Sequence, residues 1–166
     1  MSNWISNNQT KTFVRLSNSL TGAYFSMFAL AASKLSKTDD EKILATWIGA
    51  RDVNVWGNGM VFFDLSEMPW IRERFIDQKR FLINSLEFIL DQKLWEVIPY
   101  YLQDSATDII SRIKEMFGTF ELSENWNANE IKYLDTIPKS FSKCQIHGCY
   151  KNVDGCPICH NLDIRS

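Results

Sequence analysis

Four cysteines and two histidines lie within seventeen residues near the C-terminal end of the chain and are its clearest chemical groups. They include two short turns of the form ligand-x-x-ligand, at 144–147 and 156–159, separated by eight residues. Thiolate sulfur and imidazole nitrogen are the ligands that hold a tetrahedral Zn²⁺ in structural sites. Gly148 directly follows His147, where glycine accepts the left-handed backbone that closes such a turn. The sequence therefore predicts a closed zinc site that stabilises a short C-terminal segment.

The same residues resemble a known type of zinc module. The pattern Cys-x-x-His-Gly-x-aromatic, a loop and Gly-Cys-Pro-x-Cys is similar to treble-turn zinc ribbons, which are appended to phage replication factors and endonucleases. The resemblance covers residues 144–160. It implies that Cys144, His147, Cys156 and Cys159 bind the metal ion, and that Cys149 is a spectator on the strand between the two turns.

A second ligand set remains open, in which Cys149 replaces His147. We favour the set with His147, because Cys-x-x-His-Gly has the spacing of a zinc knuckle and Cys-x-x-x-x-Cys is looser. His160 is an additional candidate ligand. Its adjacency to Cys159 would strain a site that used both residues.

The remainder of the chain lacks the usual catalytic groups. Both histidines belong to the cysteine-rich segment, so no histidine is left to act as a general base elsewhere. The sequence contains no phosphate-binding loop of the P-loop or Gly-x-Gly-x-x-Gly type. The carboxylate pairs at i, i+4, Glu73 with Asp77 and Glu87 with Asp91, are typical of solvated helix faces. We therefore expect a protein that is not an enzyme.

Charge is distributed unevenly along the 166 residues, although the net charge is only −2. Residues 1–38 contain four basic and no acidic side chains, whereas residues 39–138 contain eighteen acidic and ten basic ones. Residues 139–166 are slightly basic again. This balance argues against a wholly basic nucleic-acid-binding protein. An acidic body would attract a cationic partner, because long-range fields steer association.

Helical periodicity predicts most of the elements that must position these groups. In the N-terminal part, apolar residues recur every three or four positions and predict one helical face, made of Phe13, Leu16, Leu20, Tyr24, Met27 and Ala31. Thr38 is a favourable N-cap for a second helix, because three acidic residues follow it. Ser66 predicts the start of a third helix, with Pro69 in its first turn, that runs to about residue 92. A fourth helix is expected near 105–117.

Two shorter features complete the expected fold. Alternating apolar residues on either side of Gly57-Asn58-Gly59 predict a β-hairpin, because glycine and asparagine tolerate the positive φ of such loops. Residues 119–138 are expected to be irregular, with a short helix near 129–134. Pro138 and Ser140 mark a boundary before the cysteines.

The sequence therefore predicts a mainly α fold: a helical body of about four helices with a small β-hairpin at 1–138, and a C-terminal zinc-ribbon knuckle at 139–166. The aromatic content of 13% excludes a disordered chain. The uncharged stretch 16–33 is interrupted by serine, asparagine and threonine, so we expect an ordinary helix there rather than a membrane span. We expect a cytoplasmic protein with no membrane contact.

A second resemblance begins in the segment 63–70, Phe-Asp-Leu-Ser-Glu-Met-Pro-Trp, and continues through Gln78, Lys79, Phe81, Leu82 and Trp95. Over residues 61–101 the chain resembles small bacterial immunity-type proteins, which are encoded beside polymorphic or contact-dependent toxins. The resemblance implies a protein that neutralises a cognate toxin by binding it.

The expected contacts with such a protein partner are aromatic anchors flanked by acids. A hairpin tip and a helix start would present these residues together: Trp56, Phe63, Asp64, Glu67 and Trp70. The alternative is a nucleic-acid-binding zinc-ribbon protein of phage or bacterial origin, in which the ribbon and the basic N-terminal arm contact phosphates. The ribbon carries only four basic side chains, which is sparse for phosphate binding.

Overall fold

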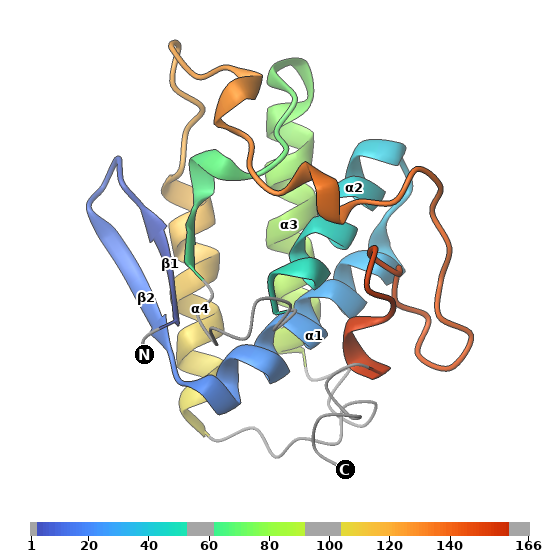
Figure 1. Ribbon diagram of the computed structural model, residues 1–166. Helices are drawn as coiled ribbons and strands as arrows, with labels where there is room; N and C mark the ends of the chain where they lie inside the picture. The colour runs from blue at the N-terminus through green and yellow to red at the C-terminus, as the bar shows by residue number, and fades with distance from the viewer. Residues whose placement is uncertain (1–2, 53–61, 92–103, 160–166) are drawn as a thin grey trace.

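The computed structural model describes residues 3–52, 62–91 and 104–159, and these form a mainly helical fold with a small sheet (Figure 1). The strands are β1 (Asn3–Asn7), β2 (Thr12–Leu16) and β3 (Phe62–Asp64), and the helices are α1 (Asn18–Leu35), α2 (Asp39–Gly49), α3 (Phe75–Leu90) and α4 (Asp104–Thr119). Short 3₁₀ turns lie at Ala50–Asp52, Leu65–Glu67, Arg72–Arg74, Ala128–Glu130 and Leu134–Thr136. The predicted mainly α fold class is confirmed.

Helix α1 is the centre of the molecule. It packs against α2 and α3, and α3 in turn packs against α4. The sequence predicts one apolar face, but α1 is buried on all sides from Thr21 to Ser33. Small residues such as Ala29 and Ala32 let its neighbours approach closely. Within the described ranges, no helix combines the length and the apolar character needed to cross a membrane.

Helix α2 begins at the predicted N-cap, and helix α4 includes the predicted range. Thr38 caps α2 with a reciprocal capping box, in which its hydroxyl accepts from the Glu41 amide and the Glu41 carboxylate accepts from the Thr38 amide. Helix α4 spans Asp104–Thr119 and so includes the predicted 105–117. Its apolar face buries Ile110, Ile113 and Phe117 against the core.

The N-terminal segment differs from the prediction. Residues Thr12–Leu16 form strand β2, so Phe13 and Leu16 are not part of the helical face expected for them. β2 pairs antiparallel with β1, and Ile5 lies opposite Val14. Both of these side chains are buried, and the residues on either side of them are more exposed. This alternation has the period of two that is typical of a strand and not the spacing of three or four that is typical of a helix. The fold therefore has a β-hairpin at 3–16.

The start of the third helix also differs from the prediction. Ser66 lies in a 3₁₀ turn that Asp64 caps, and α3 begins only at Phe75. Between them, residues 68–71 are not helical, because the buried Gln78 side chain accepts from the Ile71 amide and donates to the Pro69 carbonyl. The 3₁₀ turn at Arg72–Arg74 then leads into α3. Pro69 therefore precedes the helix instead of lying in its first turn.

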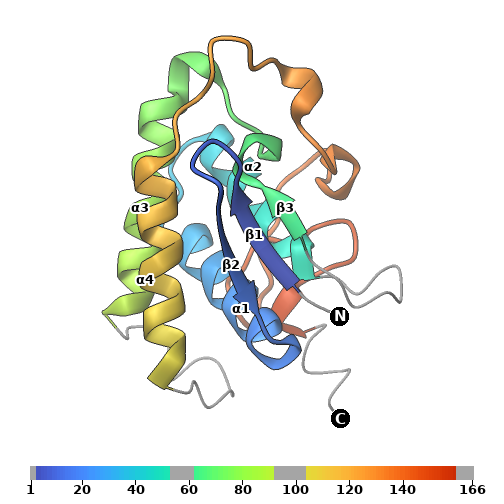
Figure 2. The ribbon, with the colours of Figure 1, turned by 90° about the vertical axis from the view of Figure 1, so that its left-hand side faces the viewer.

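The sheet has the strand order β2-β1-β3 and covers one side of α1, as Figure 2 shows. β3 pairs parallel with β1, and Asp64 ties the two strands together by accepting from the Ser6 hydroxyl at 2.9 Å and from the Asn8 amide at 2.8 Å. The hairpin predicted around Gly57-Asn58-Gly59 falls on 53–61, outside the described residues.

The irregular segment after α4 is fixed to the body by side-chain donors. The indole N–H of Trp47 donates to the Lys132 carbonyl at 2.8 Å, and that of Trp126 donates to the Ser66 carbonyl at 2.8 Å. Arg72 donates to the Trp126 carbonyl at 2.7 Å. This segment thereby leads the chain from the end of α4 to the cysteine-rich region beside α1 and α2 (Figure 1).

Candidate metal centre

The first ligand turn is built by local backbone hydrogen bonds. The Cys144 amide donates to the Cys149 carbonyl and the Gly148 amide donates to the Cys144 carbonyl, each at 2.8 Å. Gly148 has a φ of +71°, the left-handed conformation expected for it. The turn therefore places Cys144 and His147 on the same side.

The second ligand turn follows a tight reversal. Asn152 and Gly155 exchange backbone hydrogen bonds of 3.0 Å, and Gly155 has a φ of +104°. Pro157 then packs on the end of α2. A Cβ atom added to Gly49 would lie 3.2 Å from the ring of Pro157. This close approach explains why glycine occupies the last position of α2.

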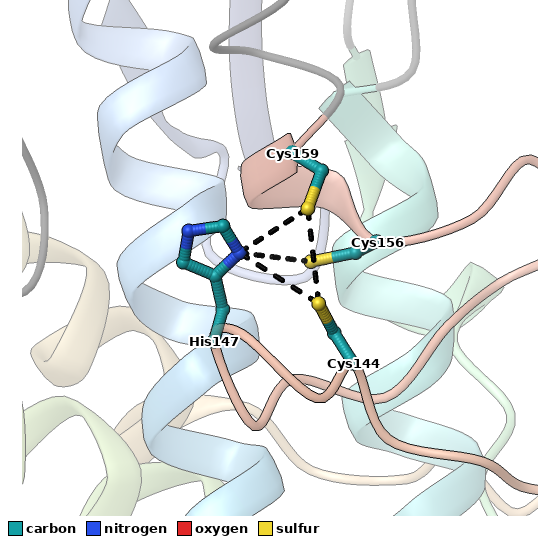
Figure 3. A group of neighbouring side chains, drawn as sticks. All are labelled: Cys144, His147, Cys156 and Cys159. Atoms are coloured by element: carbon teal, nitrogen blue, oxygen red, sulfur yellow. Dashed lines mark hydrogen bonds between the residues drawn. The ribbon is translucent and has the colours of Figure 1, made fainter.

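The two turns bring four ligand atoms together. Cys144, His147, Cys156 and Cys159 each offer one atom, and these atoms all lie within 4.8 Å of one another. Nδ1 of His147 lies 3.8 Å from Sγ of Cys144, 3.8 Å from Sγ of Cys156 and 3.3 Å from Sγ of Cys159 (Figure 3). The sulfurs of Cys144 and Cys159 are 3.7 Å apart. These four residues can bind a metal ion.

The separations fit tetrahedral coordination. Zn–S bonds of about 2.3 Å and Zn–N bonds of about 2.05 Å imply about 3.8 Å between two sulfurs and about 3.6 Å between sulfur and nitrogen. The observed distance of 3.7 Å between the sulfurs of Cys144 and Cys159 lies close to the first value, and the sulfur–nitrogen distances of 3.3–3.8 Å bracket the second. The cluster is therefore the right size for one small cation at its centre.

Without a bound cation, the three thiols of the cluster do not ionise equally. Burial opposes ionisation of Cys144, but the amides of His147 and Ile146 donate to its sulfur and lower its pKa. Burial and the Cys144 thiol raise the pKa of Cys159 to about 12, while a hydrogen bond with Cys149 and burial raise the pKa of Cys156. A divalent cation stabilises all three thiolates, so binding displaces protons.

Cys149 lies outside this group of four. Its side chain is fully buried, and its sulfur accepts from the Ser33 hydroxyl of α1 at 3.7 Å. The Ser33 hydroxyl in turn accepts from the Tyr150 amide at 3.0 Å. The segment between the two ligand turns is thus fixed to the central helix, and Cys149 is part of that contact.

Of the residues predicted to bind a protein partner, the three at 63, 64 and 70 are buried in the structure. Phe63 and Trp70 are only 3% and 2% exposed, so the expectation that they serve as surface anchors is wrong. Trp70 stacks on Phe120, and its indole N–H donates to the Leu65 carbonyl. Asp64 is buried and holds β1, as described above.

Two further residues were predicted to contact the protein partner, Glu67 and Trp56. Glu67 is half-buried and forms an ion pair with Lys132. Trp56 lies outside the described residues.

An exposed aromatic stripe on the sheet was not foreseen. Trp4, Phe13 and Phe62 are 40%, 47% and 48% exposed, and both phenylalanine rings lie 6.1 Å from the Trp4 ring. The Arg15 guanidinium lies over Phe13 at 5.6 Å. The sequence signal for this face is the alternation Val14-Arg15-Leu16, whose period of two places Phe13 and Arg15 on the side of the strand opposite Val14 and Leu16.

Comparison with protein-family models, with curated protein sequences and with solved structures yields no match to this chain. The function must therefore be inferred from the residues of the site and the surfaces of the fold.

Proposed function

We propose that Cys144, His147, Cys156 and Cys159 hold one structural Zn²⁺ ion. The convergence of three sulfurs and one imidazole nitrogen within 4.8 Å supports this most strongly. Three thiolates and one imidazole form a donor set that suits Zn²⁺ better than the oxygen-preferring Mg²⁺ or Ca²⁺. Four protein ligands leave no position for water, so the ion would stabilise the fold and would not catalyse a reaction.

A chelator experiment separates a structural ion from an adventitious one. Removal of the ion should lower the melting temperature of the full chain, because the binding free energy contributes to folding. Addition of Zn²⁺ should restore the melting temperature, and Mg²⁺ should not. An unchanged melting temperature after complete removal of the metal would overturn the structural role.

We further infer that the protein is an immunity-type binding protein that blocks a cognate bacterial toxin. The resemblance over residues 61–101 and the acidic excess at 39–138 support this role. The sequence also lacks a histidine outside the cysteine-rich segment and any phosphate-binding loop of the usual types. An occluding protein needs only a complementary surface, and an acidic body favours rapid association with a basic toxin domain.

Co-expression tests the immunity role. The chain and the product of its neighbouring gene should form a stable complex, and the chain should protect growth against that product. The association rate should fall as salt rises, because screening shortens the range of the acidic field to about 8 Å at physiological ionic strength. Absence of both a complex and protection would contradict this role.

The aromatic stripe favours a second candidate function, binding of single-stranded nucleic acid. Trp4, Phe13 and Phe62 offer exposed rings on one sheet face, and bases stack on such rings. Arg15 and Lys11 supply nearby positive charge. Binding of labelled single-stranded RNA at physiological salt, with loss in Trp4→Ala, would favour this candidate. Unaltered binding in Trp4→Ala would exclude the stripe as the platform.

A further inference from the structure

A groove of about 640 Å³ is lined by residues of β2, of the turn before it and of α4. These elements lie on the opposite side of the fold from the cysteine-rich region, as the two ribbon views show (Figures 1 and 2). One wall consists of residues 10–15, of which Thr10 and Lys11 lie in the β1–β2 turn and the four consecutive residues 12–15 belong to β2. Successive side chains of a strand point to opposite faces, so a wall of consecutive residues means that the strand edge itself faces the groove. The groove is therefore lined by backbone as well as by side chains.

That edge of β2 is not used by another strand in the described part of the chain. The sheet order is β2-β1-β3, with β2 outermost and β1 on its inner side only. The outer N–H and C=O groups of an edge strand are a template for a further strand. Natural sheets commonly protect such an edge, and here α4 stands beside it without pairing with its backbone.

The opposite wall is one face of α4. Arg112, Glu115, Met116 and Thr119 line it at helical spacing. Met116 and Val14 are buried and give the groove an apolar floor, while Thr12 and Thr119 are exposed at its rim. A strand in this groove could place alternate side chains on the apolar floor and the others toward solvent.

The charge of the groove is predominantly positive. Lys11, Arg15 and Arg112 line it against a single carboxylate, Glu115. This is the reverse of the acidic excess over residues 39–138. The groove therefore differs in sign from the rest of the body and suits an acidic ligand.

One end of the groove is fixed by the hairpin tip. The Gln9 side-chain amide donates to the Glu121 carbonyl and accepts from the Glu121 amide at 3.1 Å. This pair connects the β1–β2 turn with the chain just after α4. Such a link holds the strand and the helix apart at a set spacing, so the groove is formed before any ligand arrives.

We propose that this groove binds an extended acidic segment of a partner protein, which pairs with β2 as an additional strand. Backbone hydrogen bonds to β2 provide affinity, and the apolar floor and the three cations select the side chains. The four strand residues 12–15 that line the groove correspond to roughly 13 Å of extended chain, enough for a segment of about four residues. The site is independent of the metal centre and of any toxin-blocking role.

The probe is an octapeptide with blocked ends in which glutamate and aspartate alternate with valine, titrated into the ¹⁵N-labelled full chain. Amide shifts should change along β2 and along 112–119, with a dissociation constant of roughly 10 μM to 1 mM. A peptide with lysine in place of the acids should bind at least about fivefold more weakly. Equal binding of the two peptides would remove the basis for acidic selectivity.

Backbone methylation tests strand pairing directly. Every second N–H of an added strand faces β2, so methylating one alternate set of peptide amides should abolish binding, and methylating the other set should leave it intact. Equal effects of the two sets would overturn strand addition.

Matched protein variants locate the site. Arg112→Glu should weaken binding of the acidic peptide about fivefold, because it replaces an exposed cation that lines the groove. Lys139→Glu makes the same change of charge at an exposed position outside the groove and should leave binding unchanged. Equal weakening by the two variants would indicate a general charge effect and would contradict the site.

Two other occupants would overturn the proposal. Octathymidylate that binds the same residues more tightly than the acidic peptide would assign the groove to nucleic acid. A dimer of the chain in sedimentation, lost in Arg112→Glu, would assign it to a second copy of the chain.

Discussion

His147 and Cys149 are two residues apart and have different roles in the proposed site. His147 directs Nδ1 at three sulfurs, whereas Cys149 bonds with Ser33 of α1 outside the group of four. We predict that His147→Ala lowers zinc affinity at least roughly 10- to 100-fold, which is the loss that follows when a residue that only supports a metal ligand is changed. Cys149→Ser should retain the metal ion. Zinc titration against a competing chelator measures both affinities. The reverse order would show that the four cysteines are the ligands.

These ligands could be predicted because both turns are local in sequence. Three-residue spacing and Gly148 are sufficient to specify them without knowledge of the remaining fold. Burial, in contrast, depends on distant residues. Trp70 is buried because Phe75 and Phe120 pack on it, and no pattern within 61–101 indicates a contact with residue 120.

Arg51 is a buried cation held between two aromatic rings. Its guanidinium lies 4.3 Å from the ring centroid of Trp47 and 4.2 Å from that of Tyr133, and it donates to the Thr136 hydroxyl at 3.0 Å. Burial lowers its pKa to about 10, so it stays protonated at neutral pH. This contact joins the end of α2 to the irregular segment before the cysteines.

We predict that Arg51→Ala lowers the free energy of unfolding by about 2–4 kcal/mol, since it removes two ring contacts and leaves polar partners unsatisfied. Urea denaturation measures the change. Arg80→Ala, at a largely exposed arginine on α3, should change it by less than about 0.5 kcal/mol. Similar losses in both variants would contradict the role assigned to Arg51.

At the scale of elements, α2 shows what local sequence can determine. Thr38 and Glu41 satisfy each other's backbone groups at its start, and nothing outside the segment is needed. The N-terminal hairpin shows the limit, because the apolar residues of 13–16 fit a helical face as well as a strand. Pairing with β1 decides between them, and that pairing is a contact between segments.

The capping box of α2 leads to a prediction for Thr38. Thr38→Ala should lower the free energy of unfolding by about 1 kcal/mol, because it removes the acceptor of the Glu41 amide. Thr38→Ser keeps a hydroxyl acceptor and should retain most of the stability. Chemical denaturation of the three proteins compares them, and equal stability of the alanine and serine variants would argue against the cap.

At the scale of the whole molecule, the C-terminal segment and the helical body share one core. Cys149, Tyr150 and Ile158 are buried with the residues of α1 and α2, and Pro157 touches Gly49. The division into 1–138 and 139–166 therefore stays a prediction about folding. Local spacing predicts the ligand turns, but the surface on which they pack depends on the arrangement of distant helices.

Deletion of residues 139–166 tests that division. We predict that residues 1–138 still unfold cooperatively, with a free energy of unfolding reduced by roughly 3 kcal/mol or more, because deletion exposes the apolar surface that Ile158 covers. Thermal melting followed by circular dichroism measures this. Loss of a cooperative transition would show instead that the C-terminal segment is an integral part of the core.

Zinc content of the purified full chain tests the metal centre most directly. Elemental analysis of protein prepared without chelator should give about one zinc per chain, and Cys156→Ser, which removes a ligand, should reduce this markedly. Lys139→Glu, made outside the cluster, serves as the matched control and should retain the ion. Full-length protein that is folded, stable and free of zinc would contradict the account.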